Sequence, residues 1–248
     1  MKQAQDMTSE QLVKALHEAL GQKLRAVVLY GSAAAGDFVP GVSGRDILIV
    51  AEPIGAVELA ELAGPLRRWE QAGNPLPQIF TPRELRESAD VFPIEIWDMQ
   101  QARQVLFGTD PLADVRIDMQ HYRLQLEREL KTRLLQLRRR YVAAAGNSDR
   151  IARLMAASVS TVLVLLRAAL RLYNDAAPKE KADALEQLAQ HVKFDPQPLR
   201  EALALKQRKT PPAAAQVENS FGRYLSSIEE VIESVDRHLH GPSPPPKN

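Results

Sequence analysis

The sequence predicts an α+β protein, in which an N-terminal α/β domain with a small mixed sheet precedes an all-α antiparallel helical bundle. Three observations predict this class. Before about residue 114, short β-branched or aromatic runs alternate with stretches of helical period. After it, nearly every stretch has the helical period, and the loops between long amphipathic stretches are short. The 248 residues, 45% of them hydrophobic, are enough for two cores. We therefore expect domains at 1–112 and 113–240, followed by a disordered Pro-rich tail at 241–248.

Charge and cysteine content exclude several classes of protein. The 32 Lys and Arg against 31 Asp and Glu leave a formal net charge of +1, so a protein that coats nucleic acid is not indicated. The absence of cysteine excludes disulfides, thiolate zinc sites and cysteine nucleophiles, and it fits a cytoplasmic protein. The N-terminus lacks the apolar core of a signal peptide. The most apolar segment, 154–166, is shorter than the ~20 residues of a membrane span, so we expect a buried helix and no membrane partner.

Capping and turn signals place the helices of the first domain. The pair Thr8 and Gln11 resembles a capping box that opens a helix ending at Gly21. The run 81–84 has a hydroxyl cap, Pro at the first helical position and Glu at the third, so it begins another helix. A helix over about 56–71 is expected to be interrupted or restarted at its Gly-Pro pair. The strand candidates are Leu24 to Tyr30, Asp46 to Ala51, Gln78 to Phe80 and Ile94 to Met99.

The second domain begins with a long helix predicted over about 115–141. Its apolar residues recur at roughly 3.6 spacing, with Arg and Glu elsewhere. Its run 138–140 consists of three arginines, which we interpret as a solvated face. Gly146-Asn147 breaks the helix. The expected apolar stripe is Leu124, Leu126, Leu130, Leu134, Leu137 and Tyr141, and the further helices are expected near 149–173, 178–191, 198–206 and 213–240.

The stretch LYGSAAAGDFVPGVSGRDILIV, residues 29–50, contains the candidate functional residues. It resembles the opening motif of the nucleotidyltransferase superfamily, which has the DNA polymerase β-like fold, and most of all its small prokaryotic members. That pattern is an apolar residue, Gly-Ser, a spacer, and Asp-x-Asp inside an apolar strand, with a third carboxylate from a later strand. The residues that match are Gly31, Ser32, Ala34, Gly36, Asp37, Ser43 and Asp46.

The resemblance implies a task for each matched residue. Gly31 would let the backbone approach a triphosphate, and Ser32 would donate its hydroxyl and amide to phosphate oxygens. Residues two apart on a strand share a face, so an Asp-x-Asp pair can hold two Mg²⁺ ions that clamp the reacting oxygens of a phosphoryl transfer. Asp46 supplies one such carboxylate.

Three positions depart from the family pattern. Gly44 stands where the first Asp of the pair is expected, Arg45 fills a position that is usually apolar, and Ala35 replaces a common Arg. Arg45 would lie on the opposite strand face from Asp46 if the strand is regular. Asp37 is a substitute metal ligand or, more simply, a capping or turn residue. The expected Mg²⁺ site is therefore weakened.

Glu95 is the predicted third carboxylate. In a strand it would alternate with Ile94 and Ile96 and point away from the apolar face, whereas Asp98 has the opposite parity and is the weaker candidate. Glu95 is alternatively a solvent-facing residue without a role. On the first interpretation, both Asp46 and Glu95 would hold Mg²⁺.

Two functions follow from the resemblance. The first is transfer of a nucleoside monophosphate from a Mg-NTP to an unknown hydroxyl acceptor, with weakened activity. The second is a catalytically lapsed nucleotide-binding or regulatory protein, because Gly44 replaces a metal-binding Asp. Many such proteins carry a C-terminal bundle that binds the acceptor or forms a homodimer, and the run 106–112 resembles the linker between the two halves.

Overall fold

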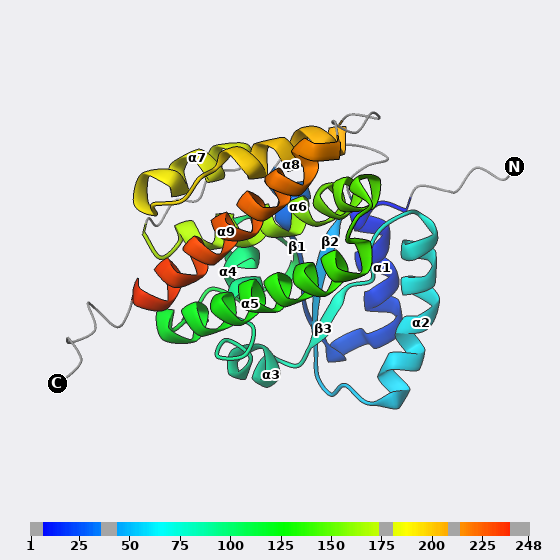
Figure 1. The fold of residues 1–248 in the computed structure, drawn as a ribbon. Helices are drawn as coiled ribbons and strands as arrows, with labels where there is room; N and C mark the ends of the chain where they lie inside the picture. Colours follow the sequence, from blue (N-terminus) through cyan, green and yellow to red (C-terminus); the bar gives the residue numbers. More distant parts are fainter. Residues whose placement is uncertain (1–6, 36–43, 174–180, 208–213, 239–248) are drawn as a thin grey trace, which may run out of the picture. The chain divides into compact units, whose positions relative to one another are not determined.

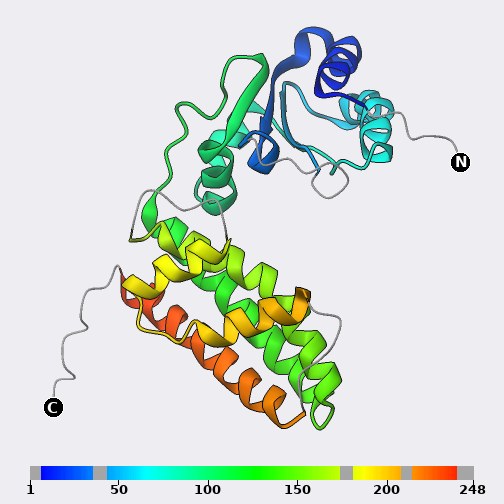
Figure 2. The same ribbon diagram turned by 90° about the horizontal axis from the view of Figure 1, so that it is seen from above.

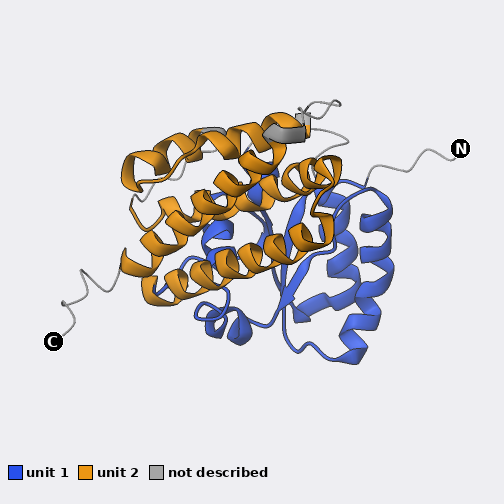
Figure 3. Ribbon diagram, in the orientation of Figure 1, with its two compact units in different colours: residues 1–118 blue, residues 119–248 orange. Residues whose placement is uncertain are grey.

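A computed structural model of the chain describes residues 7–35, 44–173, 181–207 and 214–238. The chain divides into two compact units, Met1–Asp118 and Met119–Asn248 (Figure 3). The motif residues Gly36, Asp37 and Ser43 lie outside the described residues, as does the tail at 241–248. The two units are described separately.

The first unit contains a four-stranded mixed sheet with the strand order β3-β2-β1-β4 (Figure 2). Strands β1 (Leu24–Tyr30) and β2 (Asp46–Ala51) pair antiparallel, and β3 (Gln78–Phe80) lies parallel to β2. These three strands and the mixed sheet confirm the sequence prediction. The edge strand β4 (Arg103–Gly108), which pairs antiparallel with β1, was not predicted.

Two layers of helices cover the sheet. Helices α1 (Ser9–Leu20) and α2 (Ala56–Gln71) pack on one face, and α3 (Pro82–Glu87) and α4 (Pro93–Gln101) pack on the other. Because strand side chains alternate between faces, β1 and β2 contribute to both cores. The first core includes Leu12, Leu16, Val27, Leu29, Ile47, Ile49, Leu62 and Trp69, and the second includes Ala26, Val28, Leu48, Val50, Leu85, Ile96 and Met99.

The predicted helix starts are confirmed, whereas the predicted interruption of α2 is wrong. Thr8 and Thr81 each accept a hydrogen bond from the third helical residue in a complete capping box. Helix α2 continues through Pro65, which is buried. Proline removes one helical hydrogen bond, but Leu62 and Trp69 are buried on either side of it and hold both halves of the helix on the sheet.

The strand predicted at Ile94–Met99 is wrong, because these residues belong to helix α4. A short apolar run does not distinguish a strand from a buried helix segment by its pattern. Pro93 at the first helical position favours the helix, and its buried residues are Pro93, Ile94, Ile96 and Met99. The fourth strand of the sheet is β4 instead. The run 106–112, which resembles a linker in the sequence, therefore begins inside β4.

The second unit consists of five helices among the residues described. They are α5 (Met119–Ala144), α6 (Ser148–Leu170), α7 (Lys181–His191), α8 (Gln197–Gln207) and α9 (Ala214–His238) (Figure 1). Helix α6 contacts each of the other four and forms the centre of this core. By length and composition alone, α6 is the one described helix that could cross a membrane, and half of its most apolar window is buried.

Helix α5 departs from its predicted apolar stripe at one residue. Leu126, Leu130, Leu134 and Leu137 are buried as expected, but Leu124 is 51% exposed. Residues two apart on a helix lie roughly 200° apart around the axis, so Leu124 and Leu126 cannot share one face.

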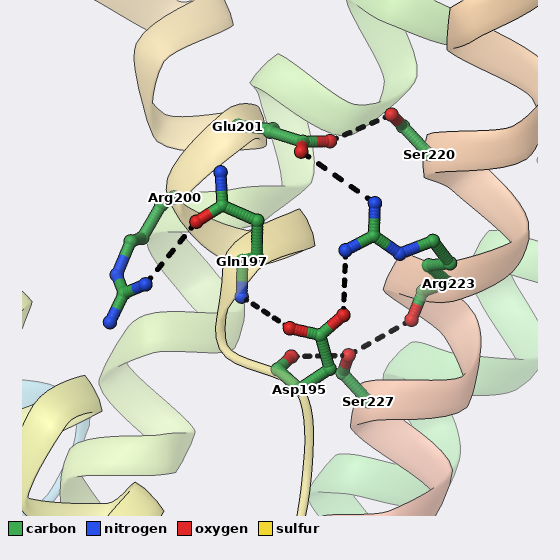
Figure 4. A network of polar contacts seen from close by, with 7 residues as sticks. All are labelled: Asp195, Gln197, Arg200, Glu201, Ser220, Arg223 and Ser227. Carbon is green, nitrogen blue, oxygen red and sulfur yellow. Dashed lines mark hydrogen bonds and ion pairs between the residues drawn. The ribbon is translucent and has the colours of Figure 1, made fainter.

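A polar network connects α8 to α9 (Figure 4). The Arg223 guanidinium lies 2.7 Å from Asp195 and 3.8 Å from Glu201, and the Ser227 hydroxyl donates to the Asp195 carbonyl at 2.7 Å. The Gln197 amide donates to the Asp195 carboxylate at 2.9 Å and so satisfies an amide at the start of α8. The hydrogen bond from Arg223, followed by that from Gln197, lowers the pKa of Asp195.

Candidate functional site

Gly31 forms the turn after β1, at the start of the short 3₁₀ helix η2 (Gly31–Ala33). Its φ of +71° lies in the left-handed region that favours glycine, and a Cβ there would lie 3.2 Å from Oδ2 of Asp46. The Gly31 amide donates to the Ala102 carbonyl at 3.0 Å. The turn is therefore fixed close to the Asp46 carboxylate, and its own first amide is already engaged.

The turn leaves Ser32 exposed. The amides of Ala34 and Ala35 donate to the Gly31 carbonyl at 3.1 and 3.0 Å, which closes the 3₁₀ turn behind Ser32. An exposed hydroxyl at the start of such a turn is suited to an anionic group.

Tyr30 and Asp46 are direct partners across the antiparallel pair of β1 and β2. Both lie on the sheet face covered by α3 and α4, because they share the strand parity of the core residues Val28 and Leu48. Burial raises the pKa of Asp46, and burial together with the Asp46 charge raises the pKa of Tyr30 to about 12. Among the described residues, no cation offsets the desolvation of this carboxylate. A cation held beside it would therefore be favoured.

Gly44 has no room for a side chain. A Cβ at this position would lie 2.4 Å from Cδ and 3.3 Å from Cγ of Pro75. Pro75 is held in place because its carbonyl accepts a hydrogen bond from Trp69 Nε1 at 3.0 Å. The neighbouring Asn74 accepts from the Arg45 amide at 3.1 Å and donates to the Trp69 carbonyl at 3.4 Å. The loop between α2 and β3 thus fills the position of the missing carboxylate.

The Arg45 side chain reaches the opposite side of the sheet from Asp46. Its guanidinium donates to the Met7 carbonyl at 3.4 Å, just before helix α1. Helix α1 packs on the other face of the sheet from α3 and α4. Arg45 therefore does not neutralise Asp46, in agreement with the strand parity.

Glu95 is exposed on helix α4, between the buried Ile94 and Ile96. The strand argument that selected it is wrong, although α4 does contact β1 and η2. Its role as a third carboxylate stays a prediction. Strand β3, the neighbour of β2 in the sheet, carries only Gln78, Ile79 and Phe80. The sheet itself brings no second carboxylate to Asp46 from this side.

These residues do not fit a pair of Mg²⁺ ions. Mg²⁺ is bound by carboxylate and phosphate oxygens and gives up its water reluctantly. Position 44 is filled by Pro75, and the described residues contain no group of three or more His, Asp or Glu side chains placed for a metal. Asp46 alone fits a single ion that arrives with its own oxygen ligands, as a triphosphate provides.

A separate cavity of about 650 Å³ lies between α1 and β4. It is on the sheet face opposite to Asp46, since α1 and Leu106 belong to the first core. His17 packs edge-on against Phe107 there, with ring centroids 5.5 Å apart. The cavity is therefore not an extension of the site at Asp46. Its lining residues are Glu10, Val13, Lys14, His17, Glu18 and Gln104 to Phe107.

Comparison with known proteins gives a likeness of fold. No protein-family model matches the chain, and no curated protein sequence matches it either. Among solved structures, the crystal structure of spectinomycin adenyltransferase AAD(9) from Enterococcus faecialis, with ATP and spectinomycin, matches with a TM-score of 0.55. The match covers 89% of this chain and 96% of that chain at 13% sequence identity. The chain therefore has a nucleotidyltransferase-like fold, with a small sheet domain and a helical region.

Sequence reasoning missed Pro75 and Asn74 as parts of the site. The run Gly73-Asn74-Pro75 signals a turn, and the chain does turn there. Nothing local indicates that this turn packs on Gly44, because that contact spans about thirty residues of sequence. The missing side chain at Gly44 was the available signal.

Proposed function

We propose that the chain is a nucleotide-binding protein with a nucleotidyltransferase-like fold, in which two-metal transfer of a nucleoside monophosphate has lapsed. The observation that carries this proposal is the contact between Gly44 and Pro75 beside the retained Asp46. If only the Asp side chain at position 44 had been lost, space for that side chain would remain. Here the α2–β3 loop, held by Trp69 and Asn74, takes that space.

The retained half of the motif supports nucleotide binding. Gly31 fixes a tight turn against Asp46, and Ser32 presents an exposed hydroxyl. We assign the triphosphate to this turn, with Asp46 beside the Mg²⁺ ion that accompanies it. The solved structure of similar fold was obtained with ATP, which makes a nucleoside triphosphate the first ligand to test.

Calorimetric titration of the full chain with ATP, GTP, CTP and UTP, with and without Mg²⁺, tests the binding site. Ser32→Ala removes one hydrogen bond to a charged phosphate and should weaken binding about 10- to 100-fold, corresponding to ~1.5–3 kcal/mol. Ser226→Ala, at another exposed serine on α9, is the matched control and should leave affinity unchanged. Absence of binding to every nucleotide would refute the proposal.

An active transferase with a single metal ion is the second candidate. It is favoured by Asp46, a carboxylate retained where its charge is desolvated. Its acceptor would be a hydroxyl compound, and spectinomycin is one to include because the structural neighbour was solved with it. Incorporation of labelled nucleotide by the unaltered chain into any acceptor of a pool of aminocyclitols, RNA ends or proteins would establish this function.

A further inference from the structure

Helix α5 carries an exposed basic and apolar stripe. Its members are four and three residues apart, except for the adjacent Arg138 and Arg139, so they lie on one side of the helix. Leu124, Leu135 and Val142 are 51%, 57% and 76% exposed. Exposed apolar side chains that lie in a row, rather than singly over the surface, indicate an interaction surface. The basic stripe consists of Leu124, Arg128, Lys131, Leu135, Arg138, Arg139 and Val142.

The basic stripe contains no carboxylate. The two acidic residues of α5 face cations of the same helix: Glu127 pairs with Arg123 at 2.8 Å and also with Lys131, and Glu129 lies 3.9 Å from Arg133. Among the described residues, Arg128 and Arg139 in the stripe have no ion-pair partner. The stripe therefore has cationic charge available for a partner.

Helix α9 carries a stripe of opposite charge. This acidic stripe has small residues at its centre, and a Cβ added at Gly222 would meet nothing within 4 Å. The acidic stripe consists of Glu218, Gly222, Ser226, Glu229, Glu233 and Asp236, of which all but the half-exposed Glu229 are exposed.

The two stripes border each other on one surface. Helices α5 and α9 run antiparallel and in contact, because Tyr141 stacks on Phe221 with centroids 4.5 Å apart at one end and Arg123 lies 3.6 Å from Asp236 at the other (Figure 1). The Arg138 guanidinium crosses the border and lies 2.6 Å from Glu229.

From this arrangement we propose that two copies of the chain associate through these stripes, each basic stripe lying on the acidic stripe of the other copy. A two-fold axis parallel to the helices produces this pairing, whereas an axis across them would place basic stripe on basic stripe. Interpolation between the contacts at the two ends places Arg128 opposite Glu233, and Leu135 opposite Ser226, of the partner subunit.

The size of the surface is sufficient for a dimer. Helices of 26 and 25 residues, ~37 Å long and ~10 Å apart, present roughly 700 Å², close to the ~800 Å² per partner of a standard interface. A lipid or nucleic-acid surface would match the basic stripe but would repel the adjacent acidic one. The second copy satisfies both stripes, and this inference is independent of the proposed nucleotide site.

Sedimentation velocity of the full chain, over a range of concentrations at about 50 mM and about 500 mM salt, tests the dimer. The unaltered chain should sediment as a dimer of twice 27.6 kDa and dissociate at high salt. Arg128→Glu/Arg139→Glu and Glu218→Lys/Glu233→Lys should each weaken self-association at least about 100-fold. Arg153→Glu, at an exposed position of α6, is the control and should remain dimeric.

Mixing the two charge-reversed variants is the decisive arm of the test. Across a two-fold axis both interfaces of the mixed dimer become complementary, so the mixture should regain a dimer that neither variant forms alone. A monomeric unaltered chain at low salt, or a mixture that stays monomeric, would overturn the inference. Binding of anionic vesicles or RNA by a monomer, lost in the Arg128 variant, would equally overturn it and assign the basic stripe to that partner.

Discussion

Replacing Gly44 by alanine places a methyl group 2.4 Å from Cδ of Pro75, where carbon atoms ordinarily approach to about 3.5–4.0 Å. Relief requires a shift of more than about 1 Å, and Pro75 is held by the 3.0 Å hydrogen bond from Trp69 Nε1. Overpacking of this kind costs about 1–3 kcal/mol. We therefore expect Gly44→Ala to destabilise the first unit by that amount.

Urea titration followed by tryptophan fluorescence measures this loss. The chain has two tryptophans, Trp69 and Trp97, and both lie in the first unit, so the signal reports that unit alone. Pro75→Ala removes the ring atoms that clash with the methyl group. In the Pro75→Ala background, Gly44→Ala should therefore destabilise the unit by about 1 kcal/mol less than it does in the unaltered chain.

The control for this prediction is the same substitution at an open glycine. A Cβ at Gly222, inside α9, would meet nothing within 4 Å, so Gly222→Ala should stabilise the second unit by roughly 0.5–1 kcal/mol in a urea titration followed by circular dichroism. If the free energy of unfolding of Gly44→Ala lies within about 0.5 kcal/mol of that of the unaltered chain, the loop moves aside and position 44 is open. The same conclusion follows if Pro75→Ala does not reduce the loss of stability.

Three further substitutions test the account. Asp46→Asn removes a desolvated carboxylate whose pKa is raised by burial, so it should stabilise the first unit by about 0.5–2 kcal/mol at neutral pH in the fluorescence titration. This gain should disappear below pH 3.8, the ordinary pKa of the carboxyl, because Asp46 is then protonated in both the folded and the unfolded chain. The same substitution should weaken Mg²⁺-dependent nucleotide binding in the calorimetric titration. Gly31→Ala forces a positive φ on alanine and should cost about 1–2 kcal/mol by the same fluorescence titration. Arg223→Gln should lower the free energy of unfolding only slightly at neutral pH, because its pair with Asp195 is exposed. This loss, followed by circular dichroism in urea, should disappear as the pH falls below 3.8, the ordinary pKa of that carboxyl, since Arg223 lowers the pKa of Asp195. Equal effects at pH 3 and pH 7 would contradict the assignments for Asp46 and Asp195.

Elements with local signals could be predicted from the sequence. The capping boxes at Thr8 and Thr81 and the break at Gly146-Asn147 each depend on residues a few positions apart, and the structure has them as expected. The strands that flank Gly31 were likewise predictable from β-branched runs. Caps, turns and β-branched runs therefore predicted these elements, whereas the local Gly-Pro pair in α2 predicted a break that the structure does not have.

Features that depend on packing were not predictable. The pattern of the run Ile94–Met99 is compatible with a strand or a helix. In the structure β4 forms the edge of the sheet, and α4 packs on the sheet face. The exposure of Leu124 depends on which side of α5 meets α6 and α9. The obstruction of Gly44 by Pro75 joins distant segments. Within the site, the sequence indicated the missing carboxylate but not what had replaced it.

The loss of transfer activity at Gly44 is best tested by following labelled nucleotide from a Mg-NTP to pooled hydroxyl acceptors. This assay compares the unaltered chain, Gly44→Asp, and Gly44→Asp/Pro75→Ala. We expect no incorporation by the unaltered chain or by Gly44→Asp, whose side chain has no room beside Pro75, and measurable incorporation by the double variant. If the unaltered chain incorporates nucleotide and Asp46→Asn abolishes this activity, transfer has not lapsed and the chain is an active enzyme.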